Sequence, residues 1–190
     1  MKASLLSPLA LAAVLSLTSA GPALAETFTT LDAEASSITF GYSQMNVKMD
    51  GSFSELKARE FSFDPAAPEA AKVVVDVALA SIDAGYADAN SELEKDEWLA
   101  LKQHPLATFT SSSVQAQGEG QYQVKGELSI KGNTHPVTVP FTFKQDGEKG
   151  IFEGDFTLQR ADFGIGEGQW KDFSIVANDI QVRFHIVATP

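Results

Sequence analysis

Three histidines are the residues of this chain whose type most directly suggests metal or acid–base chemistry. His104, His135 and His185 lie far apart in the sequence, and none stands at metal-ligand spacing from a second ligand. A zinc site needs three or four convergent ligands, and the chain contains no cysteine. The pattern predicts structural or solvent-facing histidines, no bound metal and no cofactor.

Motifs for nucleophilic catalysis and phosphate binding are also missing or incomplete. No Gly-x-Ser-x-Gly turn presents a serine nucleophile. The glycines of 164–168 resemble a phosphate loop, but 169–172 read Gln-Trp-Lys-Asp where a helix N-terminus would have to follow. The acidic run 92–97 lacks the alternating ligands and the turn glycine of a calcium loop. We interpret the first stretch as a turn at the rim of a barrel and the second as a solvated helix face.

Arg160 and Asp162 lie two residues apart where a strand is predicted to end. A charge-assisted hydrogen bond between them would brace the following loop. Alternatively, Arg160 donates hydrogen bonds to the headgroup of a ligand, because a partly buried guanidinium is a ready donor to carbonyl oxygens. An enzyme would need a polar group inside the barrel, and the nearest candidate, Asp76, is placed outside by alternation. We therefore predict a protein that is not an enzyme.

The elements that must position these groups are strands, since apolar and polar residues alternate at a period of two through most of the chain. Eight strands are expected, near 37–42, 51–63, 72–80, 107–114, 122–130, 137–143, 151–159 and 179–187. The period changes between Ser81 and Gln103, where Ser91 and Glu94 have capping-box spacing. This predicts one or two short helices that present Trp98. The fold class is all-β with a small α insertion, an antiparallel eight-stranded barrel.

The N-terminus has the form of an export signal. Lys2 precedes an apolar run over 5–17, and Ala23-Leu24-Ala25 is a small-x-small cleavage site. We expect residues 1–25 to be removed and 26–190 to form a single domain. Loss of Lys2 changes the formal charge from −11 to −12, which disfavours nucleic-acid binding and electrostatic docking on membranes. No later segment approaches the roughly 20 apolar residues of a membrane span.

The 13 phenylalanines fall mostly on the apolar faces of the strands. An eight-stranded barrel is about wide enough to hold either its own side chains or one slim ligand. Alternation does not decide between a filled and a hollow interior. Trp98 and Trp170 are the best candidates for a mouth, because they are expected at the ends of the barrel.

Seven sequence blocks in the right order then give the chain a resemblance to a known family. The blocks are 36–40, 50–53, 61–65, 80–83, 97–99 with 104–109, 126–132, and 160–166. In this order the chain resembles the YceI-like family of periplasmic, polyisoprenoid-binding proteins with a lipocalin-like barrel. Many members have a histidine just after the first strand. This chain has Ser43-Gln44-Met45-Asn46-Val47 there, so no role of that histidine carries over.

The resemblance implies a periplasmic carrier that holds a polyprenyl chain or an isoprenoid quinone tail in its apolar interior, with no catalytic centre. On this interpretation Arg160 is the headgroup candidate. The expected lining residues are Phe40, Tyr42, Phe61, Phe63, Trp98, Phe109, Val139, Phe141, Phe152, Phe156, Trp170 and Phe184. The alternative is a non-catalytic stress or interaction protein with a filled barrel that acts through its surface. The oligomeric state stays open, with a homodimer as one alternative.

Overall fold

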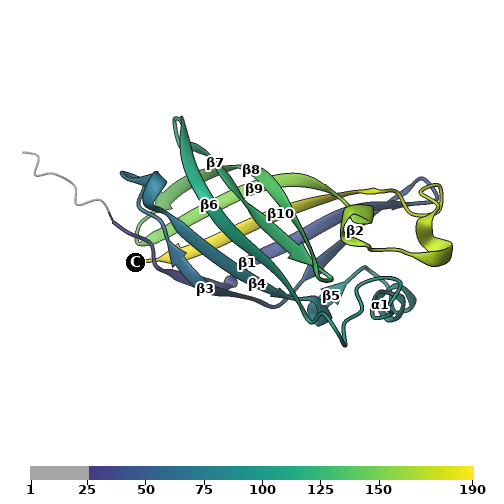
Figure 1. The fold of residues 1–190 in the computed structure, drawn as a ribbon. Helices are drawn as coiled ribbons and strands as arrows, with labels where there is room; N and C mark the ends of the chain where they lie inside the picture. The colour runs from purple at the N-terminus through teal and green to yellow at the C-terminus, as the bar shows by residue number, and fades with distance from the viewer. Residues whose placement is uncertain (1–25) are drawn as a thin grey trace, which may run out of the picture.

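A single curled antiparallel sheet dominates the computed structural model, which describes residues 26–190 (Figure 1). The predicted signal peptide, residues 1–25, lies outside the described residues. The strands are β1 (Thr30–Gln44), β2 (Val47–Phe53), β3 (Leu56–Ser62), β4 (Lys72–Ala78), β5 (Ile82–Asp83), β6 (Leu106–Gly118), β7 (Gln121–Ile130), β8 (Asn133–Asp146), β9 (Lys149–Gln159) and β10 (Asp179–Thr189). The only α-helix of the described part is α1 (Ala87–Leu93).

The sheet comes round on itself through one bent segment of chain. The strand order is β3-β4-β6-β7-β8-β9-β10-β1-β2-β5. β2 pairs with β1, and β3, which follows it directly, pairs with β4. An isolated bridge between Phe28, which precedes β1, and Phe63, which follows β3, adds a second link across the closure of the sheet. Counted as one bent strand, β2 and β3 complete the eight strands expected from the sequence, and the two-residue β5 is additional.

Two boundaries differ from the expectation. β1 begins at Thr30 rather than near Ser37, because its pairing with β10 continues through an irregularity between Asp32 and Ser37. The helix begins four residues before Ser91, so Ser91 does not cap it. The Asn90 side chain anchors this region instead, since its Oδ1 accepts from the Ala84 N–H at 2.7 Å.

Aromatic side chains fill the end of the barrel that lies near the C-terminus. The ring centroids of Phe63 and Phe143 are 4.9 Å apart, and those of Phe63 and Phe152 are 5.0 Å apart. Tyr122 stacks on Phe141 at 5.3 Å. We call these five residues together with Phe28 the aromatic plug. α1 and the loop 160–178 lie at the opposite end of the barrel (Figure 1).

Several rings inside the barrel lie directly over glycines of the neighbouring strand. A Cβ on Gly51 would come 2.2 Å from Phe40 Cζ, and a Cβ on Gly154 would come 2.6 Å from Phe184 Cζ. Both rings occupy the space that a side chain at the glycine would need. They therefore lie close to the sheet and leave the middle of the barrel free.

Within residues 26–190, no helix has the length and apolar character required to cross a bilayer.

Candidate functional site

A cavity of about 530 Å³ occupies the barrel beside the aromatic plug. This volume is within the roughly 300–1,000 Å³ typical of small-molecule sites. The interior is thus filled at one end and hollow along the rest. The filled-barrel hypothesis describes only the end that holds the plug.

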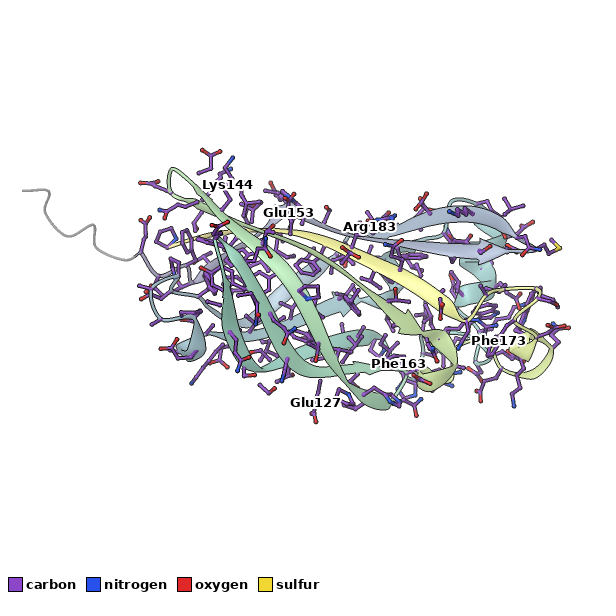
Figure 2. The ribbon with its side chains drawn as sticks, turned by 90° about the horizontal axis from the view of Figure 1, so that it is seen from above. Glu127, Lys144, Glu153, Phe163, Phe173 and Arg183 are labelled. Carbon is purple, nitrogen blue, oxygen red and sulfur yellow. The ribbon has the colours of Figure 1, made fainter. Side chains whose placement is uncertain are left out.

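Strand alternation builds the wall of the cavity. On β10, Ile180, Val182, Phe184 and Ile186 line the cavity. The intervening Arg183 donates to Asp50 Oδ1 at 2.7 Å, and His185 lies 2.8 Å from Glu153 Oε1 on the outer face. Charged residues such as Glu127 and Lys144 project away from the sheet (Figure 2). The period of two therefore separates an apolar interior from a charged exterior.

All thirteen side chains singled out from the sequence lie on the wall of this one cavity. They are Phe40, Tyr42, Phe61, Phe63, Trp98, Phe109, Val139, Phe141, Phe152, Phe156, Arg160, Trp170 and Phe184. The strands place them there, and their part in binding stays a prediction.

Aliphatic wall residues were missed by the sequence reasoning. Val73, Val75 and Val77 of β4 line the cavity, as do Val124 and Leu128 of β7. The signal was present, since these positions also alternate. Asp76, between Val75 and Val77, lies outside as alternation predicts, and it pairs there with Arg59 Nε at 2.8 Å.

The polar lining residues gather at the end of the cavity opposite the plug, which we call the mouth. Tyr86 and Asp88, the only lining residues classed as exposed within the described chain, both lie there. Tyr86 donates to Gln44 Oε1 at 2.9 Å, and Tyr42 donates to the Ala84 carbonyl at 3.0 Å. Burial, with a smaller contribution from Tyr86, raises the pKa of Tyr42, so this hydroxyl stays a neutral donor. The cavity thus has an apolar tube and one polar end.

Arg160 organises the loop at the mouth. Its side chain is 1% exposed. Nε donates to the Ala177 carbonyl, Nη1 to those of Ile165 and Gly166, and Nη2 to those of Trp170 and Val176, at 2.7–3.1 Å. Burial lowers the pKa of Arg160.

The expected pair between Arg160 and Asp162 is not among the ion pairs of the described residues. The guanidinium turns into the barrel while Asp162 stays exposed. Arg160 therefore braces the loop as expected, but through backbone carbonyls. All five of its N–H groups are engaged in this way, and its role toward a headgroup stays a prediction.

The two tryptophans meet at the mouth. Their ring centroids are 5.4 Å apart, and the Arg160 guanidinium carbon lies 5.6 Å from the Trp98 ring centroid. Trp170 Nε1 donates to Glu92 Oε1 at 3.2 Å. Trp98 Nε1 is buried and has no hydrogen-bond partner within residues 26–190.

The histidines take no part in the cavity wall. His135 Nε2 donates to the Asp162 carbonyl at 2.8 Å and packs edge-on against Phe163. His104 lies beside Gly132, and His185 is outside the sheet as described above. Among the described residues, no three His, Asp or Glu side chains are grouped so as to hold a metal ion.

The apolar wall of the cavity, with polar groups at one end, is suited to retaining an apolar molecule.

Comparison with known proteins finds relatives over most of the chain. A family model described as the YceI-like domain matches residues 30–188. A UPF0312 protein of Vibrio cholerae is 32% identical over 181 residues, which is 90% of this chain and 95% of that protein. A UPF0312 protein of Azotobacter vinelandii is 37% identical over 111 residues, and the match covers 55% of this chain and 58% of that protein.

Solved structures share the architecture. BcnA of Burkholderia cenocepacia superposes with a TM-score of 0.80 at 38% identity, covering 84% of this chain and 99% of BcnA. A polyisoprenoid binding domain from Saccharophagus degradans superposes with a TM-score of 0.67 over 85% of this chain and 97% of that domain. At 15% identity the second match shows the fold alone.

Proposed function

This chain belongs to the YceI-like family, and from that premise we propose that it is a periplasmic carrier that holds one isoprenoid lipid in its barrel, without turnover. The observation that carries the proposal is the cavity, a tube with an apolar wall and polar groups at one end only. An isoprenoid has the same division, with a long apolar tail and at most one polar end. The domain of the same fold from Saccharophagus degradans is a polyisoprenoid binding domain, and this supports the ligand class.

Burial of the tail supplies the affinity. Each Å² of apolar surface removed from water contributes roughly 25 cal/mol, from which the cost of ordering a flexible chain is subtracted. A catalytic role has no support in the site, because Tyr42, Tyr86, Arg160 and Trp170 at the mouth bond to neighbouring side chains or to backbone carbonyls.

The first test is to purify the protein from its native host without denaturation, extract it with solvent and analyse the extract by mass spectrometry. A stoichiometric prenyl lipid or quinone is the expected result. A clean extract, together with no uptake of an added long-chain quinone, would contradict the carrier function. The mass of the purified chain tests export at the same time, since cleavage after Ala25 leaves Glu26 as the first residue.

A pair of variants on β9 tests the position of the tail. Phe156 lines the cavity, whereas the neighbouring Thr157 is exposed on the outer face. Phe156→Glu places a charge in the apolar tube, so we expect the extracted lipid to fall to a small fraction of the wild-type amount. Thr157→Glu adds the same charge to the same strand and retains the lipid. Equal lipid content in both folded variants would remove Phe156 from the site.

A further inference from the structure

Exposed hydrophobic side chains gather on the loops around the mouth. Within residues 26–190, five large hydrophobic side chains are exposed. One of them, Leu106, begins β6 and lies on the outer face of the sheet, since the next residue lines the cavity. Figure 2 shows Phe173 at the opposite end of the barrel from Lys144. We call the four that lie on the loops of the mouth the apolar rim: Met45, Val47, Tyr86 and Phe173.

Hydrogen bonds hold the three segments of the apolar rim together. The backbone N–H of Met45, in the turn between β1 and β2, donates to the carbonyl of Ile175 at 2.8 Å, two residues after Phe173. The Tyr86 hydroxyl donates to the side chain of Gln44, the residue before Met45. Tyr86 and Gln44 also line the cavity. The apolar rim is therefore continuous with the wall of the tube, and such a cluster around an opening marks a binding surface.

The backbone of the turn between β1 and β2 does not favour a methionine. Met45 has φ = 47° and Asn46 has φ = 65°, both in the left-handed region. Asparagine and glycine adopt this conformation readily, whereas a methionine there is strained. Met45 is also 67% exposed, so packing within the protein does not compensate for the strain. A residue that neither backbone nor packing favours points to a function, and contact with an apolar partner supplies one.

The β1–β2 turn and the loop before β10 differ in charge from the rest of the chain. Residues 43–49 and 168–176 contain two cations, Lys48 and Lys171, and one carboxylate, Asp172, so together they carry +1, whereas the whole chain carries −11. The carboxylates that line the mouth belong to α1. Repulsion from an anionic surface is therefore weakest where these two loops project.

The size and position of the apolar rim favour a bilayer over a second protein. Its four side chains are few beside the roughly 20–30 residues that each partner contributes to a stable protein interface. A few apolar and aromatic side chains are enough for a shallow contact with the interface of a membrane. The apolar rim also surrounds the mouth of the tube, and a tightly bound protein there would block the exchange of a ligand.

We propose that the apolar rim inserts into the surface of a lipid bilayer, so that the mouth faces the membrane from which the isoprenoid is taken or to which it is returned. This inference rests on the proposed function, and it adds the partner and the orientation of docking. The contact is apolar rather than electrostatic, which agrees with the negative charge of the chain. Added salt therefore does not weaken it.

The test measures binding to sedimenting vesicles made of phosphatidylethanolamine with a smaller share of phosphatidylglycerol. The double variant Met45→Asn, Val47→Thr replaces two apolar side chains by residues that suit the turn and the strand. We expect its partition coefficient to be about tenfold lower than that of the wild type, because less apolar surface leaves water. Leu106→Thr is the matched control, since Leu106 is exposed on the outer face, and it binds vesicles like the wild type.

The double variant also separates docking from folding and from retention of the ligand. Neither Met45 nor Val47 lines the cavity, so the variant takes up an added long-chain quinone as the wild type does. The single variant Met45→Asn relieves the strain of the turn, and we expect it to unfold at the same temperature as the wild type or at a higher one. A residue with only a structural role would show the opposite effect on unfolding.

A second measurement tests the orientation. The chain contains no cysteine, so one introduced cysteine carries an environment-sensitive dye at a single place. Lys48→Cys places the dye beside the apolar rim, and Glu148→Cys places it in the turn between β8 and β9, near the aromatic plug. Vesicles are expected to shift the emission of the first dye to shorter wavelength and to leave the second unchanged.

Three results would overturn the proposal while the carrier function still stands. The first is equal vesicle binding by the wild type and the double variant, or an equal loss in Leu106→Thr. The second is an equal shift of both dyes. The third is a wild-type chain that ignores vesicles and sediments as a dimer that the double variant does not form, which would show that a second copy covers the apolar rim. Failure of the wild type to take up the quinone would instead contradict the carrier function itself.

Discussion

Arg160 shows how one buried side chain shapes the mouth of the cavity. Its five hydrogen bonds reach carbonyls on both sides of the loop between β9 and β10. Gly166 makes room for it, because a Cβ at that position would come 2.1 Å from Arg160 Nη1. Gly166, one of the glycines that resemble a phosphate loop in the sequence, therefore lies against a cation that belongs to the protein.

Replacing Arg160 by lysine keeps the charge but supplies three donors on one atom in place of a planar array of five. Buried carbonyls would lose their partners, so we expect Arg160→Lys to lower the free energy of unfolding by about 2–4 kcal/mol. Denaturant unfolding of the delipidated protein measures this loss. A change below about 0.5 kcal/mol would show that water replaces the missing donors.

Residue types in the sequence identified the contributors to the wall but not how their polar atoms are used. Arg160 was visible as a donor near the end of a strand, yet a sequence does not show that loop carbonyls occupy all of its N–H groups. Trp98 was assigned to the mouth from its place in a helical insertion. Its lack of an acceptor depends on packing against Trp170 and Arg160, residues more than 60 positions away in the chain.

At the scale of elements, the width of the cavity depends on which side chain opposes each ring across the sheet. Phe184 lies directly opposite Gly154 in the register between β10 and β9, and Phe40 lies opposite Gly51 between β1 and β2. A glycine beneath each ring lets it lie flat against the sheet. Larger residues at these glycines would move the rings into the cavity.

Gly154→Ala tests this arrangement. The added methyl group would lie 2.6 Å from Phe184 Cζ and 2.4 Å from the Pro140 carbonyl oxygen. We expect a loss of about 1–3 kcal/mol in the free energy of unfolding and weaker retention of an added long-chain quinone. Gly41→Ala is the control, because its methyl group would meet only ordinary contacts, the nearest at 3.5 Å. Equal behaviour of both variants would contradict the role of the glycine.

Alternation predicted the eight main strands because a half-buried strand has a period of two whatever its neighbours are. It did not locate the break at Ser54 and Glu55, where one strand changes partner from β1 to β4. It also misplaced the start of α1, since Ser91 and Glu94 have capping spacing but Asn90 supplies the hydrogen bonds that anchor the helix. Local patterns identify elements, whereas partner changes are decided by tertiary contacts.

The whole molecule combines a filled end, a hollow tube and a polar mouth in one barrel. Composition alone did not decide between a filled and a hollow interior, because phenylalanine suits both. The structure uses phenylalanines for both purposes, with Phe143 and Phe63 in the plug and Phe156 and Phe184 along the tube.

A tube of limited volume predicts how affinity depends on chain length. With a series of ubiquinones of increasing isoprene number, affinity should rise with each unit while the added surface is buried in the tube. It should then level off once the tube is full. Competition against a fluorescent fatty-chain probe measures the series. A continuous rise to the longest chains would indicate that the tail leaves the tube and binds along another surface.

The aromatic plug closes one end of the barrel, so the tube opens at the mouth only. A lipid tail bound in such a tube would enter first and leave last. The polar end would then be the only part of the bound lipid that a membrane or a receiving protein could contact. Loading and unloading would use the same opening, and unloading would reverse the steps of loading. The net direction of transfer would depend on whether the donor or the acceptor of the lipid binds it more tightly.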